Sequence, residues 1–351
     1  MTRLYATLFT ILCSVFTFAK PADTGDYYQK ADGKKAAELK TALFQIISPH
    51  EIQTYTPGVW DAINSYDIRE DGKIWEIYSS ISNFTPKEDQ DRGDDIEVEG
   101  VVYNREHAFP KSWFNESTTV DNYSTSVYPM YTDLHHLFPT DRNVNGMRSN
   151  YPYGEVGDKI TKQSEGGFSK FGRCTNELGY KVSGLNGRVF EPNDEYKGDL
   201  ARVYFYMATA YESYKNEKGV ERSPKNWSSD MLTSDIYPFF TDWALKMLLR
   251  WSQQDPISEK EIKRNDAIYK IQKNRNPFVD YPGLEQYIWG TYKDVAFSYN
   301  NYEPVITGIR TFHKLVTTDD DAIYTLQGQR VSGTTLKKGI YVRRGKKFVV
   351  K

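Results

Sequence analysis

The sequence predicts an α+β fold, with a core of mixed helical and β structure and a small β-rich C-terminal tail. Apolar residues recur at intervals of three and four in some segments and alternate with polar residues in others. Near the C-terminus, glycines separate short alternating runs such as GIYVRRGKKFVV. The chain has 351 residues, and chains of this size bury most of their surface. We therefore expect a large hydrophobic core.

Residues 1–19, MTRLYATLFTILCSVFTFA, combine one arginine near the start with a short apolar run and a Thr-x-Ala ending. Such a run is too short to cross a bilayer, so a signal peptide is predicted and a buried N-terminal helix is the less favoured alternative. Cleavage would leave Cys174 as the only cysteine, and no internal disulfide is expected. No later segment is predicted to span a membrane.

Four later segments are predicted to be helices: 34–48, 194–215, 235–253 and 258–273. The apolar stripe of the second is assigned to core packing in preference to a platform for nucleobases. Segments 73–81 (KIWEIYSSI) and 98–104 (VEGVVYN) alternate and are predicted to be strands. The charged segment 86–99 is predicted to be a solvated loop in preference to a calcium site, and the Gly- and Ser-rich segment 159–187 a loop along the cleft.

The segment 103–153 has the composition of an active site. It holds three of the five histidines in the chain, together with carboxylates, amides and arginines. These candidate residues are Glu106, His107, Asp133, His135, His136, Arg142, Asn143, Asn145, Arg148 and Asn150.

The residue types in this segment indicate hydrolysis of a phosphodiester. His107 is neutral near pH 7 and can accept a proton from water. Glu106 and a downstream asparagine offer hard oxygen ligands, which suit Mg²⁺ or Ca²⁺ and leave room for waters and phosphate oxygens. Arg148, one helical turn after Asn145, is placed to bind a phosphate through two hydrogen bonds.

Strand geometry limits how these residues can act together. Neighbouring residues on a regular strand point to opposite faces, so Glu106 and His107 share a site only if the strand ends or twists there. Pro110 allows such an end. By the same argument His135 and His136 cannot both face one metal from a flat strand, and a packing role is favoured for His135.

The runs EHAFPKSW and DLHHLFPTDRNVNGMRSN resemble the endonuclease I family of secreted bacterial nucleases. Further blocks at 187–211 and 248–282 also resemble this family, and the similarity covers roughly residues 35 to 295. Several blocks in matching order are more specific than a single EH or NxxR pattern.

The resemblance implies a ββα-metal (His-Me) finger at about residues 99–153. In this finger one strand presents His107, a second strand runs through DLHHLFP, and a helix starts near Asn143. His107 would be the general base, while Glu106 and Asn145 would hold one Mg²⁺, with Mn²⁺ or Ca²⁺ as substitutes. His136 and Arg148 are further catalytic candidates. Candidates for orienting these groups or binding substrate are Asp133, His135, Arg142, Asn143 and Asn150.

The chain departs from the family at one catalytic position. Family members use an arginine between the two strands to stabilise the scissile phosphate, and this chain has only Lys111 between His107 and Asp133. Arg148 or Arg142 is predicted to supply the charge.

Charge is distributed unevenly along the chain. Residues 330–351 contain eight Lys or Arg and no Asp or Glu, and because the whole chain carries −2, residues 1–329 carry −10. A nuclease with this net negative charge needs a local basic cleft to bind nucleic acid. The tail at 311–351 resembles sorting domains of the type IX secretion system, which predicts the cell surface or medium as destination. The alternative is a basic strand pair that recruits nucleic acid, with a periplasmic location.

Together these features predict a secreted, metal-dependent, sequence-nonspecific endonuclease, with a catalytic domain at residues 20–300, that leaves 5′-phosphate ends on DNA, RNA or both. Two other classes stay open. A zinc hydrolase needs three or four nitrogen or sulfur ligands, and the chain has no HExxH. A noncatalytic nucleic-acid-binding surface protein would tolerate loss of Glu106. No oligomeric state is predicted.

Overall fold

The computed structural model describes residues 23–93, 97–114, 129–175, 187–215, 219–302 and 304, and the backbone of three strands between 323 and 350. The chain divides into two compact units, residues 1–304 and 305–351. The predicted signal peptide lies outside the described residues. In the described part, no helix has both the length and the apolar character needed to cross a membrane.

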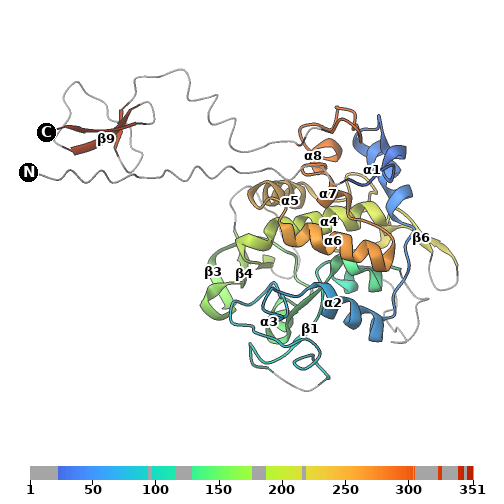
Figure 1. Cartoon of the computed structure of the whole chain (residues 1–351), viewed down its shortest axis with the longest axis horizontal. Coiled ribbons are helices and arrows are strands. Elements are labelled where there is room, and N and C mark those ends of the chain that lie inside the picture. The colour runs from blue at the N-terminus through green and yellow to red at the C-terminus, as the bar shows by residue number, and fades with distance from the viewer. Residues whose placement is uncertain are drawn as a thin grey trace, which may run out of the picture. The chain divides into compact units, whose positions relative to one another are not determined.

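The α+β fold class is confirmed (Figure 1). The helices of the first unit are α1 (Ala36–Ile47), α2 (Trp60–Tyr66), α3 (Arg142–Arg148), α4 (Lys197–Ala210), α5 (Asp242–Gln254), α6 (Glu259–Gln272), α7 (Pro277–Asp280) and α8 (Glu285–Ile288). Its strands are β1 (Tyr103–His107), β2 (Leu137–Asp141), β3 (Val156–Gln163), β4 (Lys170–Cys174), β5 (Arg188–Glu191), β6 (Tyr214–Lys215) and β7 (Glu221–Arg222).

Helix α4 lies at the centre of the first unit, where it packs against α1, α5 and α7 (Figure 1). Every residue of this helix is buried, as expected for a helix enclosed on all sides. Its charged residues are paired in the interior; Lys197 binds Glu191 at 2.7 Å and Arg202 donates to Glu261 at 2.8 Å. The predicted packing role of segment 194–215 is confirmed.

Helix α6 begins and ends close to the predicted limits because its boundaries are set locally. Ser258 and Glu261 form a capping box at its start, and Lys273 takes the left-handed conformation at its end. Helix α5, in contrast, begins seven residues later than predicted, at Asp242. Pro238 lies in the missing part, and proline disrupts a helix interior.

Three predictions of secondary structure were wrong. In segment 98–104 only Tyr103 and Asn104 lie in a strand, β1. Segment 73–81 is not a strand, because the Glu76 carboxylate takes the place of a partner strand and accepts hydrogen bonds from the backbone N–H groups of Tyr78 (2.9 Å) and Asp141 (3.0 Å). Segment 159–187 is not a simple loop, because β3, β4 and β5 form an antiparallel sheet in that order. Strand β3 is largely exposed and lacks the apolar alternation that predicts strands.

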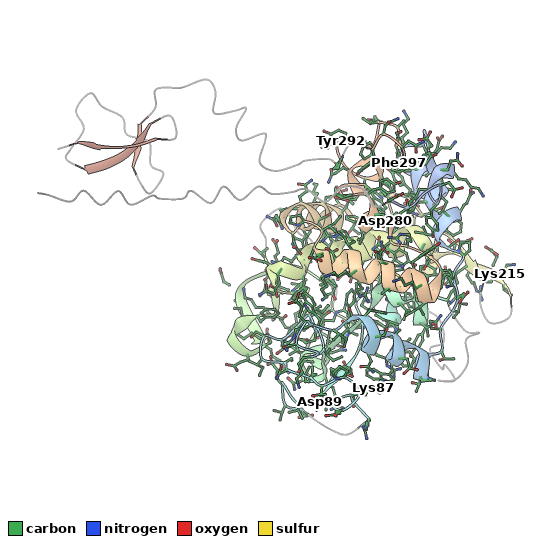
Figure 2. The ribbon with its side chains drawn as sticks, in the orientation of Figure 1. Lys87, Asp89, Lys215, Asp280, Tyr292 and Phe297 are labelled. Carbon is green, nitrogen blue, oxygen red and sulfur yellow. The ribbon has the colours of Figure 1, made fainter. Side chains whose placement is uncertain are left out.

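Figure 2 marks two ends of the first unit. Tyr292 and Phe297 lie at the end that holds α8, and Lys87 and Asp89 lie at the other end, near β1 and α3 (Figures 1 and 2). The second unit contains a three-stranded antiparallel sheet of β8 (Ile323–Thr325), β9 (Gly339–Arg343) and β10 (Lys346–Val350). These strands agree with the β-rich tail predicted from the sequence.

Candidate active site

A hairpin followed directly by a helix forms the candidate site. Strands β1 and β2 are antiparallel, with His107 opposite Leu137 and Glu106 opposite Phe138. Asp141 ends β2 and caps α3, because its carboxylate accepts hydrogen bonds from the N–H groups of Asn143 and Val144. The strand–strand–helix order implied by the family resemblance is therefore present, and the helix starts at Arg142.

The second strand is shorter than predicted. DLHH forms a 3₁₀ turn at Leu134–His136, because the Asp133 carboxylate accepts a hydrogen bond from the His135 N–H at 2.9 Å. Within this turn the side chains of the two histidines have different neighbours. The His135 ring packs against Tyr206, with centroids 4.4 Å apart, whereas the His136 ring lies 5.3 Å from the His107 ring.

Oxygen-bearing side chains from β1 and α3 meet on one side of the hairpin. Asn104 and Glu106 are two residues apart on β1 and so share a face. The Asn145 side chain of α3 donates to Asn104 at 2.7 Å, and it also hydrogen-bonds to Glu106. Tyr78 donates to Glu106 at 2.9 Å. Burial raises the pKa of Glu106, and the charge of Arg148 opposes this shift.

These donors fit a hard, hydrated cation. The Glu106 carboxylate and the Asn104 amide oxygen both accept hydrogen bonds from Asn145. Mg²⁺ typically binds through one or two protein carboxylates and keeps several waters. Within the described ranges, no group of three or more His, Cys, Asp or Glu side chains could hold a metal. Glu106 and Asn145 would leave most coordination positions of a hydrated cation such as Mg²⁺ to water and phosphate.

The His107 ring is fixed in one orientation. Its Nε2 bonds to the carbonyl oxygen of Tyr131 at 2.9 Å; since a carbonyl only accepts, Nε2 is the protonated nitrogen and Nδ1 keeps the lone pair. The ring also packs against Tyr55 and Tyr131. Burial lowers the pKa of His107 well below its ordinary value, so the imidazole is neutral at pH 7. Strand β1 ends at this residue, as joint use of Glu106 and His107 requires.

Arg148 lies in the interior behind the Glu106–His107 pair. It is 1% exposed, and its guanidinium contacts the Glu106 carboxylate at 3.0 Å. It also donates to the backbone carbonyls of His107 (3.1 Å) and Ala108 (2.7 Å). In place of the predicted phosphate contact, this arginine supports the end of β1. The other predicted arginine, Arg142, pairs with Asp91 at 3.2 Å.

Two cations that sequence reasoning did not assign lie on the His107 side. The Arg105 guanidinium stacks 3.5 Å from the centroid of Tyr55, and the Lys111 amino group lies 5.5 Å from that of Tyr131. Both charges further lower the pKa of His107. The position of Arg105 could have been predicted, because it lies two residues before His107 and residues two apart on a strand share a face.

The remaining candidates do not join the Glu106–Asn145 cluster. Asp133 is fully buried and accepts hydrogen bonds from Tyr206 (2.7 Å), Tyr211 (2.6 Å) and Gln272 (2.8 Å). The side chain of Asn143 donates to the carbonyl of Glu97, and that of Asn150 donates to Ser112.

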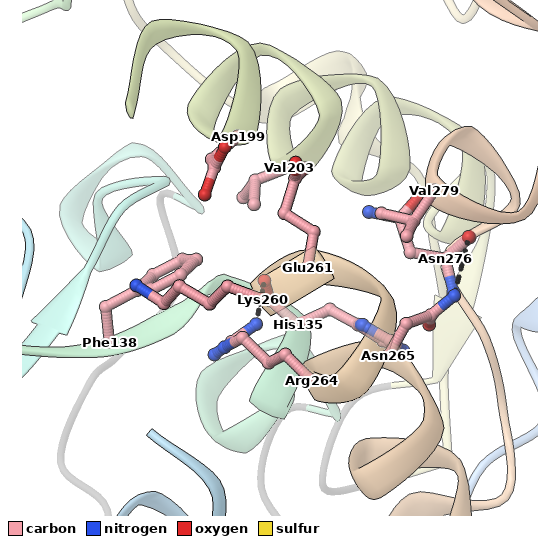
Figure 3. Close-up of a pocket in the computed structure, with 10 residues that line it drawn as sticks. All are labelled: His135, Phe138, Asp199, Val203, Lys260, Glu261, Arg264, Asn265, Asn276 and Val279. Atoms are coloured by element: carbon pink, nitrogen blue, oxygen red, sulfur yellow. Dashed lines mark hydrogen bonds between the residues drawn. The ribbon is translucent and has the colours of Figure 1, made fainter. Parts of the chain in front are cut away.

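A network of buried charges lies behind the hairpin (Figure 3). Arg264 donates to the carbonyls of Leu134 (2.8 Å) and Leu137 (2.6 Å) and pairs with Asp67 at 3.1 Å. His135 lines a small cavity beside it, with Asp199, Lys260 and Glu261. Arg264 is thus held inside the protein by backbone carbonyls and an ion pair.

Comparison with known proteins settles the family. The family model for endonuclease I matches residues 35–283, which include all of β1, β2 and α3. This chain belongs to the endonuclease I family. The predicted enzyme class, a nuclease, is thereby confirmed.

Several curated relatives of this endonuclease I family member are exported nucleases. The extracellular ribonuclease of Bacillus amyloliquefaciens is 34% identical over 273 residues, which cover 76% of this chain and 79% of the relative. The extracellular ribonuclease of Bacillus subtilis is 32% identical over 79% of this chain and 84% of the relative. A periplasmic deoxyribonuclease of Aeromonas hydrophila is 26% identical over 67% of this chain and 88% of the relative. These relatives support a secreted or periplasmic location.

Proposed function

We propose that this protein is a secreted, Mg²⁺-dependent endonuclease that hydrolyses DNA, RNA or both without sequence specificity and leaves 5′-phosphate ends. The main support is the neutral His107 ring, which the Tyr131 carbonyl fixes at the end of β1, next in sequence to Glu106, whose carboxylate contacts Asn145. Relatives named as ribonucleases and as a deoxyribonuclease support both kinds of substrate.

His107 acts as the general base in this proposal. Its Nδ1 takes a proton from a water whose oxygen attacks phosphorus, and the 3′-oxygen on the opposite side leaves with the electron pair of the broken bond. The Tyr131 carbonyl holds the ring and stabilises the imidazolium that forms. The packed ring of His136 restricts movement of the base.

Glu106 and Asn145 would hold the metal ion. When bound, Mg²⁺ supplies positive charge to a phosphate oxygen and to the departing 3′-oxygen. Tyr78 and Arg148 keep the Glu106 carboxylate in a fixed position through their hydrogen bond and ion pair. Arg105 and Lys111 supply cationic charge on the His107 side, in the role that the family gives to an arginine between the strands.

Digestion of three substrates tests the proposal: supercoiled plasmid, single-stranded DNA and structured RNA. We expect cleavage in Mg²⁺, loss of cleavage in EDTA and recovery when excess Mg²⁺ is added. Binding without turnover in Mg²⁺, Mn²⁺ or Ca²⁺ would instead favour the noncatalytic surface protein. One tightly bound zinc per chain, measured by elemental analysis, would favour a zinc hydrolase.

The change Glu106→Gln tests the metal ligand. Glutamine keeps the shape of the side chain but removes its negative charge, so the Mg²⁺ concentration for half-maximal activity is expected to rise by about 10- to 100-fold. Magnesium titrations of initial rate measure this shift. Glu97→Gln removes an exposed carboxylate near α3 and should behave as wild type. An unchanged magnesium requirement in E106Q would remove Glu106 from the ligand set.

The change Arg148→Met tests whether this arginine supports the fold. It leaves the buried Glu106 carboxylate without its ion pair, which is expected to destabilise the protein by about 3–5 kcal/mol. Arg142→Met, which breaks a more exposed pair, should cost about 1 kcal/mol or less. Urea unfolding compares the two. Wild-type stability in R148M, combined with a raised KM, would restore its predicted role as a phosphate ligand.

A further inference from the structure

Two arginines face each other on the sheet of β3, β4 and β5. Arg173 on β4 pairs in register with Arg188 on β5, and both side chains are exposed. Like charges directly opposite on neighbouring strands destabilise a sheet. In the part of the chain that the structure describes, neither arginine has an ion-pair partner. The pair therefore adds nothing evident to the stability of the fold.

A third cation lies on the same face of this sheet. Lys162 of β3 is in register with Phe171 of β4, and residues in register share a face. Phe171 is two residues before Arg173 and so points to that face too. The Arg188 guanidinium lies 5.9 Å from the Phe171 ring. The face thus presents Lys162, Arg173 and Arg188 around the buried rings of Phe171 and Phe190, which are in register. We call it the basic face.

Nearby acidic residues do not neutralise the basic face. Glu191, at the end of β5, pairs with Lys197 of α4 at 2.7 Å. Glu155, just before β3, pairs with Arg250 of α5. Both carboxylates are bound by cations outside the sheet and so do not pair with the basic face. The positive charge of this face is local, since residues 1–329 carry a net charge of −10.

The basic face adjoins the candidate active site. Tyr151, just after α3, packs against Phe171 with ring centroids 4.5 Å apart. Tyr153 bridges to Phe190 of β5, and its hydroxyl contacts that of Tyr78, which in turn bonds to Glu106. Figure 1 shows β3 and β4 beside α3 and β1. A rigid packed connection therefore joins the sheet to the Glu106 cluster.

We propose that the basic face binds the phosphate backbone of the nucleic acid on one side of the scissile bond. The inference rests on the proposed nuclease function and adds a binding site to it. A guanidinium binds a phosphate through two parallel hydrogen bonds, and phosphate contacts of this kind position a strand without reading its sequence. The acidic body of the protein makes such a local cluster necessary for capture of a polyanion.

The double variant Arg173→Gln/Arg188→Gln tests the basic face. Binding of a labelled 20-nucleotide DNA and RNA is measured by fluorescence anisotropy in EDTA, where no cleavage is expected. We expect Kd to rise about tenfold at moderate salt, and the slope of log Kd against log salt to fall by about 1.4–1.8, as for two lost phosphate contacts. In Mg²⁺, KM for long polymers should rise while kcat changes less than twofold.

Two further variants control for folding and for net charge. Arg173→Lys/Arg188→Lys keeps the charge and should bind within about threefold of wild type. Lys30→Gln/Lys34→Gln removes two exposed charges next to α1, on the other side of the unit from β3 and β4 (Figure 1), and should leave Kd and the salt slope unchanged. An unchanged slope in the Arg-to-Gln variant, or an equal loss in the Lys-to-Gln variant, would overturn the proposal.

The assay separates this inference from the proposed function. Suppose that the wild-type protein cleaves nucleic acid and that the Arg-to-Gln variant binds and cleaves equally well. The proposed binding site on the basic face is then wrong, and the proposed nuclease function is unaffected. If the wild-type protein cleaves no substrate but binds nucleic acid through Arg173 and Arg188, the nuclease mechanism is wrong and the proposed binding site on the basic face is supported.

Discussion

Replacement of His107 by alanine is expected to lower kcat/KM by about 1000-fold, within the range of about 10²–10⁴ for loss of a general base. The structure provides the physical reason. The Tyr131 carbonyl fixes Nε2 as the protonated nitrogen, and burial keeps the ring neutral. Alanine removes the only lone pair that this position offers to a water. Initial rates on plasmid DNA at saturating Mg²⁺ measure the loss.

His50 provides the matched control. This residue is half-buried, and its ring contacts the Ser48 carbonyl and Tyr211, outside the hairpin and α3. His50→Ala should keep activity within about twofold of wild type. Circular dichroism and thermal unfolding would show whether H107A is folded. Turnover of folded H107A equal to that of wild type would remove His107 from the mechanism.

Helices and strands whose ends are set by residues close in sequence could be predicted, whereas those shaped by tertiary contacts could not. Helix α6 was predicted well because Ser258 caps its start through its own side chain. The segment around Glu76 alternates like a strand, yet its partner is a single carboxylate that also binds the backbone of Asp141, 65 residues away. No local pattern contains that contact. Strand β3 escaped prediction because most of its side chains are polar and exposed, so that no apolar alternation marks it.

The candidate site shows the same division. Residue types and family resemblance identified Glu106, His107 and Asn145, and the structure brings the side chains of Glu106 and Asn145 into contact on the strand that ends at His107. The sequence could not show which side of the backbone each remaining group faces. Arg148 follows Asn145 by one helical turn, but α3 packs so closely on β1 that the arginine is enclosed. The charge of Arg148, which was predicted to bind substrate, pairs instead with the buried Glu106 carboxylate.

Asp133 was predicted to orient the catalytic groups or to bind substrate, and its burial favours the first of these roles. Its carboxylate accepts hydrogen bonds from two tyrosines, one glutamine and the His135 N–H, which come from four places in the sequence. Helices α4 and α6 both contact this group, which caps the 3₁₀ turn. These contacts show that Asp133 organises the fold around the site.

Asp133→Asn is expected to destabilise the protein by about 3–5 kcal/mol at pH 7, because uncharged asparagine accepts fewer of the buried donors. Urea unfolding measures this change. Asp294→Asn, at an exposed position, should change the free energy of unfolding by less than about 0.5 kcal/mol. A stable D133N protein without activity would instead place Asp133 in the chemistry.

The pH dependence of this stabilisation has a definite sign. Burial alone would raise the pKa of Asp133, but His50, His135 and His136 and the Tyr211 hydroxyl together hold it below its ordinary value. A carboxyl whose pKa is lower in the folded state stabilises the protein fully above its unfolded pKa of about 3.9. The contribution is lost as pH falls further. The stability difference between wild type and D133N should therefore be complete at pH 7 and shrink below about pH 4. A difference that grew on acidification would mean that Asp133 is protonated in the folded protein.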